Sequence, residues 1–250
     1  MKSSMLVRGV WLLSLFLAIS GCGPTLEERR QKANTQLQLG VAEYTQGNLE
    51  KAMEAFKRAR KHDPNNPEVY IAFGLVYFEQ RKYGEAITAF KKALQLDPNF
   101  LKAHNNLGTT YAQLQNWDQA IMHFKEARND PLYRTPELAH YNLGLALMER
   151  QRQGDLIEAV KEFHAAVKIR PDFVRALEKY GVALYRLNRS QEAIKQLKKA
   201  IEVDSEYIDP YHTLGIVYMK LGKKEEAIAQ FKHVLEHSTM MNLQQAQSDT

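Results

Sequence analysis

The chain contains a single cysteine, Cys22, among its 250 residues. Without a second thiol, no internal disulfide can form, even in an oxidising compartment. The sequence also lacks a glycine-rich phosphate loop, a Gly-x-Ser-x-Gly element and a His-Glu-x-x-His element. Those patterns supply phosphate binding, an activated serine and a zinc-bound water in the enzymes that carry them. We therefore expect a non-enzymatic protein that uses no cofactor and binds no small-molecule substrate.

The chain also has only a small excess of positive charge. The formal net charge is +5, and removing the two cations Lys2 and Arg8 of the N-terminal segment leaves +3. No basic run is longer than two or three residues. Such a weak and scattered excess does not indicate nucleic-acid binding. The hydrophobic fraction of 44% and the charged fraction of 25% are typical of a folded soluble domain.

No apolar run is long enough to cross a bilayer. The longest, residues 9–19, follows Lys2 and Arg8 and has the length of a signal-peptide core. It ends in Ile19-Ser20-Gly21-Cys22, which resembles a bacterial lipobox. This resemblance implies cleavage before Cys22 and lipidation of its thiol. The alternative is a retained membrane anchor with a chance cysteine.

A lipidated Cys22 would hold the mature chain on a membrane surface. Gly23 rather than aspartate follows the cysteine, and by resemblance to known sorting signals this favours the outer membrane, with the protein facing the periplasm. Thr25 and Glu28 have the spacing of a capping box, which predicts a helix start directly after the anchor. We therefore assign residues 1–21 to a removed signal and 22–32 to the lipidated N-terminus and the start of the first helix.

Six copies of one pattern fill the rest of the chain. A glycine preceded by a large apolar residue recurs at steps of 34, 34, 36, 37 and 34 residues. An alanine follows each glycine after 12 residues, or after 15 in the fourth copy, and a large apolar residue stands four positions further on. The six glycines are Gly40, Gly74, Gly108, Gly144, Gly181 and Gly215.

This period resembles the tetratricopeptide repeat, a pair of antiparallel helices that stacks into a superhelix. The expected fold is therefore all-α, a superhelical solenoid of six repeats with about twelve helices. In the second copy, Tyr70, Phe73, Gly74 and Tyr77 form one helical stripe, and Gly74 lets the helix that carries Phe90 approach closely. The predicted repeats are 33–66, 67–100, 101–136, 137–173, 174–207 and 208–241, followed by a flexible tail at 242–250.

Two junctions depart from the period. The fourth copy has an insertion of three residues, placed at 151–153, for which loop variation is the favoured interpretation. The third copy ends in a stretch with a Tyr133-x-x-Pro136 element before Asn142-Leu143-Gly144. Lipobox, six copies and this junction together resemble the PilF, PilW and Tgl family of type IV pilus lipoproteins. The insertion has no counterpart that we can match to the family.

The resemblance implies an outer-membrane lipoprotein, a pilotin, that helps the type IV pilus secretin to localise and to form its multimer. Its partners would be the secretin and, through the lipid, the membrane, and the chain by itself would be a monomer. One alternative is a general scaffold of the cell envelope, acting in peptidoglycan or outer-membrane assembly. An enzyme subunit that uses the repeats as a targeting arm would need a further domain, for which no residues remain.

A partner-binding groove is predicted on the first helix of each repeat, one residue along from the packing stripe, because one residue is about 100° of helix rotation. Apolar side chains dominate this stripe in the first, second and fourth copies, which suits an amphipathic helix or an extended apolar segment. The alternative is that neighbouring repeats cover some of these side chains. The candidates are Leu37, Val41, Tyr44, Ile71, Leu75, Phe78, Tyr141, Leu145 and Met148.

The histidines give no metal site in the sequence. His233 and His237 are four residues apart on the last predicted helix, but no third ligand accompanies them. His104 and His140 occupy a large packing position of their repeats and are expected to be structural.

Overall fold

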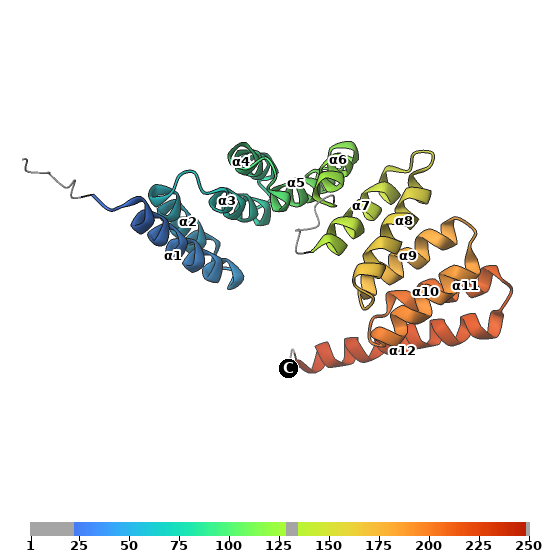
Figure 1. The fold of residues 1–250 in the computed structure, drawn as a ribbon. Coiled ribbons are helices and arrows are strands. Elements are labelled where there is room, and N and C mark those ends of the chain that lie inside the picture. The colour runs from blue at the N-terminus through green and yellow to red at the C-terminus, as the bar shows by residue number, and fades with distance from the viewer. Residues whose placement is uncertain (1–22, 129–134, 249–250) are drawn as a thin grey trace, which may run out of the picture.

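A computed structural model describes residues 23–128 and 135–248 of the chain, with side chains described as far as residue 237. Within these residues the fold is entirely helical, which confirms the all-α solenoid (Figure 1). No helix in the described residues combines the length and apolar character needed to cross a membrane. The helices are α1 (Leu26–Thr45), α2 (Leu49–His62), α3 (Pro67–Glu79), α4 (Tyr83–Leu96), α5 (Leu101–Gln113), α6 (Trp117–Arg128), α7 (Pro136–Arg150), α8 (Asp155–Ile169), α9 (Val174–Arg186), α10 (Ser190–Val203), α11 (Asp209–Lys220) and α12 (Lys224–Ser248).

Each odd-numbered helix pairs with the even-numbered helix that follows it, and the six pairs follow one another along a curved path (Figure 1). The odd-numbered helices of neighbouring pairs also contact each other. The backbones of the even-numbered helices of neighbouring pairs lie further apart, and among the described residues only long side chains bridge two of them, where Lys125 and Arg128 of α6 pair with Glu158 and Glu162 of α8. The odd-numbered helices are therefore closer together and line the inner, concave face, while the even-numbered helices are splayed over the outer face.

The glycine of each repeat allows the two helices of a pair to pack closely. A Cβ built on any of the six repeat glycines would lie closer than 3.0 Å to the large side chain of the paired helix. Gly74 faces Phe90 in this way, and the Phe90 side chain is almost fully buried. The facing residues are Phe56, Phe90, Phe124, Phe163, Leu197 and Phe231. The role predicted for Gly74 is thus confirmed, and the same packing recurs in every repeat.

The turn within each helix pair has a residue with positive φ, seven positions after the repeat glycine. These residues are Gly47, Arg81, Gln115, Gln151, Asn188 and Gly222. In the fourth repeat, Gln151 still occupies this position, and a second residue with positive φ, Gly154, precedes α8. The three extra residues are therefore 152–154, one position later than the sequence analysis placed them.

The start of α1 has the predicted capping box. The Glu28 backbone N–H donates to Thr25 Oγ1 at 3.1 Å, and the Thr25 backbone N–H donates to Glu28 Oε2 at 2.8 Å. These two bonds satisfy donors that the first turn of a helix otherwise leaves to solvent.

The C-terminal segment is helical as far as it is described. We predicted a flexible tail at 242–250, and the backbone of α12 is helical to Ser248. The reason lies in composition, because seven of the eight residues at 240–247 are methionine, leucine, glutamine or alanine, and none is proline or glycine. These are good helix formers, so a helix already started at Lys224 continues through them.

Candidate functional site

The predicted groove residues lie on α1, α3 and α7, three of the helices that line the inner face. Val41 is the most open of them, with 47% of its surface exposed. Five others are half-buried, and their outer atoms remain accessible: Leu37, Tyr44, Leu75, Phe78 and Leu145. An apolar surface therefore exists on the inner face, most openly on the first two repeats.

Three of the predicted groove residues are buried instead. Ile71, Tyr141 and Met148 have exposures of 2%, 9% and 6%. Tyr141 packs against the rings of Phe163 and Phe173, with centroids 6.0 and 5.0 Å apart. Sequence spacing places these residues on one stripe of each helix, but it does not show which parts of that stripe the neighbouring elements cover. The accessible groove is thus narrower than the predicted one.

Internal contacts hold the inner face of the first two repeats in place. The Tyr44 hydroxyl donates to Glu79 Oε1 at 3.2 Å, which joins α1 to α3. Burial and the neighbouring Glu79 carboxylate raise the pKa of Tyr44 to about 12, so the hydroxyl stays protonated. Phe78 packs edge-on against Tyr83 with ring centroids 5.5 Å apart. The apolar surface is consequently preorganised.

A pocket of about 300 Å³ lies further along the same face, between α5 and α7. We call it the α5–α7 pocket. Leu145, one of the predicted groove residues, lines it together with Thr109 and Ala112, which occupy the same stripe in the third repeat. Trp117, Asn142 and Glu149 also line it. The polar members make this part of the inner face different from the apolar surface on the first two repeats.

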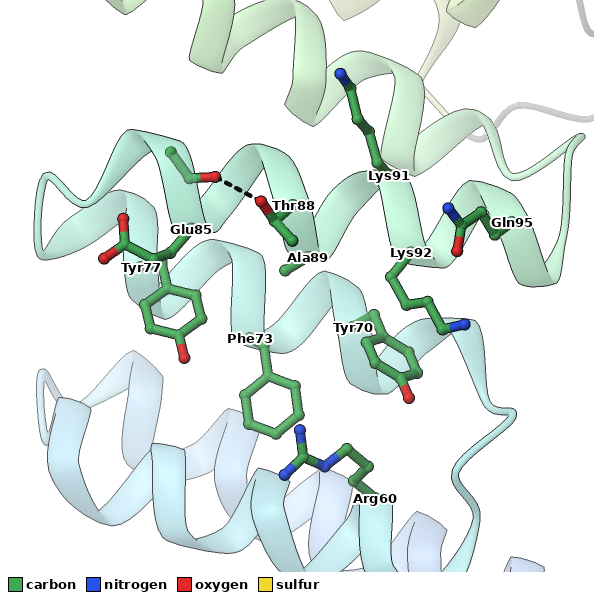
Figure 2. A pocket seen from close by; sticks show the side chains of 11 residues that line it. Arg60, Tyr70, Phe73, Tyr77, Glu85, Thr88, Ala89, Lys91, Lys92 and Gln95 are labelled. Carbon is green, nitrogen blue, oxygen red and sulfur yellow. Dashed lines mark hydrogen bonds between the residues drawn. The ribbon is translucent and has the colours of Figure 1, made fainter.

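A further cleft lies on the other side of the chain. It has a volume of about 690 Å³ between α2 and α4, with α3 as its floor (Figure 2). We call it the α2–α4 cleft. Its lining residues are Arg60, Tyr70, Phe73, Tyr77, Gly84, Glu85, Thr88, Ala89, Lys91, Lys92 and Gln95. The sequence analysis did not identify this cleft, and only Tyr70, Phe73 and Tyr77 were named there, as packing residues.

The cleft exists because a small residue occupies one position of α4. Ala89 stands fifteen residues after its repeat glycine, and the corresponding residue of the third repeat is His123. His123 fills the equivalent space, where its ring stacks on Tyr111 with centroids 5.6 Å apart and its Nδ1 lies 3.0 Å from that of His104. The fourth repeat has Glu162 there, which contacts His140 Nδ1 at 2.6 Å and also pairs with Arg128.

The histidines take structural roles, as expected for His104 and His140. Burial, followed by the charges of His104 and Lys91, lowers the pKa of His123 to about 4, so this ring is neutral near pH 7. His233 stacks on Tyr211 with ring centroids 3.9 Å apart, and His237 Nε2 lies 3.8 Å from a Glu206 carboxylate oxygen. No group of three metal-binding side chains occurs among the residues that the structure describes.

Two residues that carried the family resemblance, Cys22 and Tyr133, lie outside the described residues. Pro136 is the first residue of α7, with Thr135 as its N-cap. Proline suits this position because the first turn of a helix needs no N–H from it.

A family model described as a TPR repeat matches residues 40–80, 74–115 and 183–222. These segments fall in the first to third and in the fifth and sixth helix pairs. They agree with the helix pairing and glycine packing described above. A comparison with curated proteins returned no match.

Several solved structures have the same fold. PilF of Pseudomonas aeruginosa superposes with a TM-score of 0.75 at 17% identity, covering 89% of this chain and 99% of PilF. PilW, described as a widely conserved type IV pilus biogenesis factor, gives a TM-score of 0.71 at 21% identity, covering 80% of this chain and 90% of PilW. MamA gives 0.62 at 26% identity, covering 68% of this chain and 96% of MamA. At these identities the similarity establishes the tetratricopeptide-repeat fold.

Proposed function

We propose that this tetratricopeptide-repeat chain is a lipid-anchored adaptor of the outer membrane that binds the type IV pilus secretin and promotes its multimerisation. The repeat fold supports a protein-binding role. The finer assignment is supported by the lipobox ending at Cys22, by the Tyr133–Pro136 junction, and by the similar fold of two proteins named for pilus biogenesis. The chain would bind its partner without catalysing a reaction.

The observation that carries the proposal is the apolar surface on α1 and α3. Leu37, Val41 and Leu75 keep accessible atoms on the inner face. This surface belongs to the two repeats nearest the proposed lipid anchor, and α1 starts at Leu26, four residues after Cys22. A secretin subunit at the same membrane would therefore meet the apolar surface first.

The size of this surface indicates weak binding that membrane attachment strengthens. Five side chains that each hide about 50 Å² contribute roughly 6 kcal/mol at 25 cal/mol/Å². Association costs about 4–15 kcal/mol in lost freedom of movement, so these contacts alone leave little net affinity. Confinement of both partners to one membrane raises their effective concentration and shifts the balance toward the complex.

The proposal is tested by immunoblotting for heat- and SDS-resistant secretin multimers in cells with and without the gene. We expect the multimer to disappear while the monomer persists. Unchanged multimers would rule out the pilotin role and favour the general envelope scaffold. Crosslinking would then identify the partner, and cell-wall assembly factors would be the first candidates.

A matched pair of variants connects the role to the groove. Val41→Asp places a charge on the most exposed groove position, and Ile157→Asp places the same charge on an exposed apolar residue of α8, 54% exposed on the outer face. We expect Val41→Asp to reduce multimer formation and Ile157→Asp to leave it unchanged, with both proteins folded by circular dichroism. Equal amounts of multimer in the two variants would show that the groove does not take part in secretin assembly.

A further inference from the structure

The α2–α4 cleft is a second surface, separate from the inner groove. Its floor is the α3 stripe of Tyr70, Phe73 and Tyr77. The groove residues of the same helix lie one residue along from this stripe, about 100° around the helix. The spaces between the next even-numbered helices are occupied by His123 and Glu162. In the second repeat, Ala89 leaves the corresponding space open to solvent.

Three cations line the cleft: Arg60, Lys91 and Lys92. The Lys91 ammonium lies over the Tyr111 ring of α5, 6.0 Å from its centroid, and the other two have no carboxylate partner among the described residues. The Arg60 guanidinium from α2 lies over the Phe73 ring, 5.1 Å from its centroid, and Lys92 lies beside Tyr70 (Figure 2). Within the described residues, neither forms a salt bridge with an acidic side chain. Glu85 is the one acidic residue among the lining residues, and Figure 2 shows it near Tyr77 at the other end of the cleft. The cleft therefore has a cationic end and an acidic end above an aromatic floor.

We propose that the α2–α4 cleft binds an extended acidic segment of a partner protein, with an aromatic or branched aliphatic side chain inserted beside Phe73. The inserted side chain replaces the missing one at Ala89, as His123 does in the next repeat. Acidic residues of the segment pair with Arg60 and Lys92, which are already at the surface and cost little to desolvate.

The charges favour a peptide over an anionic membrane surface. A membrane-binding face needs several cations and no acid beside them, because each contributes only about 1 kcal/mol to lipid attraction. Here Glu85 repels phosphate at one end of the cleft. The Gln95 amide at the cationic end can hydrogen-bond to a peptide backbone. A volume of about 690 Å³ lies within the range of sites that enclose compact ligands.

The test measures binding of a short fluorescent peptide of glutamate and serine with one central phenylalanine, by fluorescence anisotropy, to the full-length protein in detergent. Two control probes replace phenylalanine with alanine or glutamate with lysine. Phosphatidylglycerol vesicles test whether the cleft binds an anionic membrane surface instead of a peptide. We expect binding of the first probe and none of the controls. Equal binding of the alanine probe, or binding of vesicles in place of peptide, would overturn the proposal.

Variants locate the binding within the cleft. Ala89→His reproduces the side chain of the third repeat, and Thr88→Trp blocks the cleft from an exposed position of α4. We expect each to abolish binding. Lys92→Glu should weaken binding about tenfold, while Lys198→Glu, the same charge change on the exposed surface of α10, should have no effect. Full binding by both Ala89→His and Thr88→Trp, or equal loss in the two lysine variants, would place the peptide elsewhere.

The two surfaces can be separated experimentally. This proposal does not depend on the pilus role, because the peptide assay contains no secretin. Loss of peptide binding in Ala89→His with normal secretin multimers would support two independent surfaces. Failure of the peptide to bind, with multimers still dependent on Val41, would overturn the cleft proposal alone.

Discussion

Phe163 fills the space beside Gly144 that a side chain at that position would need. The two residues are nineteen apart in the sequence, whereas the five other pairs of this kind are sixteen apart. The extra residues 152–154 are therefore confined to the turn, and the packing of α7 against α8 is preserved.

Replacing Gly144 tests this packing directly. Gly144→Ala brings a Cβ closer than 3.0 Å to the buried Phe163 ring, so the helices must separate. We expect a loss of about 1–3 kcal/mol in the free energy of unfolding, measured by urea denaturation. The control is Gly84→Ala, which meets no atom within 4 Å and should be neutral or stabilising by up to about 1 kcal/mol.

The inserted turn of the fourth repeat depends on a buried carboxylate. Asp155 is 5% exposed and accepts two hydrogen bonds from Arg150, at 2.9 and 2.6 Å, and one from the Arg152 backbone N–H at 2.8 Å. Asp155→Ala should cost about 2–4 kcal/mol in unfolding free energy, because the Arg152 N–H loses its partner and Arg150 keeps only its bond to the exposed Asp118. Substituting the exposed Asp172 by alanine should change it by less than about 0.5 kcal/mol. Equal losses would show that the carboxylate does not stabilise the turn.

The pKa of His123 makes stability depend on pH. Burial lowers the pKa of this ring from its ordinary 6.5 to about 4, so the unfolded chain binds a proton more readily than the folded one. This penalty is absent above pH 6.5 and develops as the pH falls from 6.5 to about 4. At pH 5 it amounts to about 2 kcal/mol.

His123→Gln removes this titration, and glutamine already occupies the position in the fifth and sixth repeats, as Gln196 and Gln230. Urea unfolding at pH 7 and pH 5 should show a smaller difference for the variant than for the parent protein. An unchanged difference would assign the acid sensitivity to other groups.

At the turn residues with positive φ, introducing a glycine and replacing a glycine should have opposite effects on stability. Gln115 has φ 55°, a conformation that costs a side-chain-bearing residue roughly 1 kcal/mol or more. Gln115→Gly should therefore leave stability unchanged or raise it slightly, whereas Gly222→Ala, at φ 72°, should lower it by about 1 kcal/mol. Thermal unfolding monitored by circular dichroism would measure both. A loss in Gln115→Gly as large as that in Gly222→Ala would contradict the backbone argument.

The parts of the fold that repeat along the chain could be predicted from the sequence. Gly74 and Phe90 are recognisable because the same pair recurs in the other copies, and the Thr25 cap follows from local spacing. Such features depend on residues close in sequence and on helix geometry alone. The bonds of Asp155 were not predicted, because the insertion is unique to its repeat.

The accessible surfaces were harder to predict. The predicted stripe lies on helices of the inner face, but the burial of Ile71, Tyr141 and Met148 depends on how far neighbouring repeats rotate against each other. The α2–α4 cleft has a signal in the sequence, the small Ala89 where the next copies have His123 and Glu162. The small residue can be interpreted as an open cleft only once the spacing between the even-numbered helices is known.

That spacing also has a mechanical consequence. Because every contact between the described helices joins the same or adjacent pairs, a pull applied between α1 and α12 passes through each interface in turn. Small rotations at successive interfaces add up, so the distance between the two ends can change without any helix unfolding. The splayed outer helices leave room for this bending. The molecule can thus lengthen and shorten elastically, and the separation of its two ends is set by many small adjustments at the interfaces between pairs.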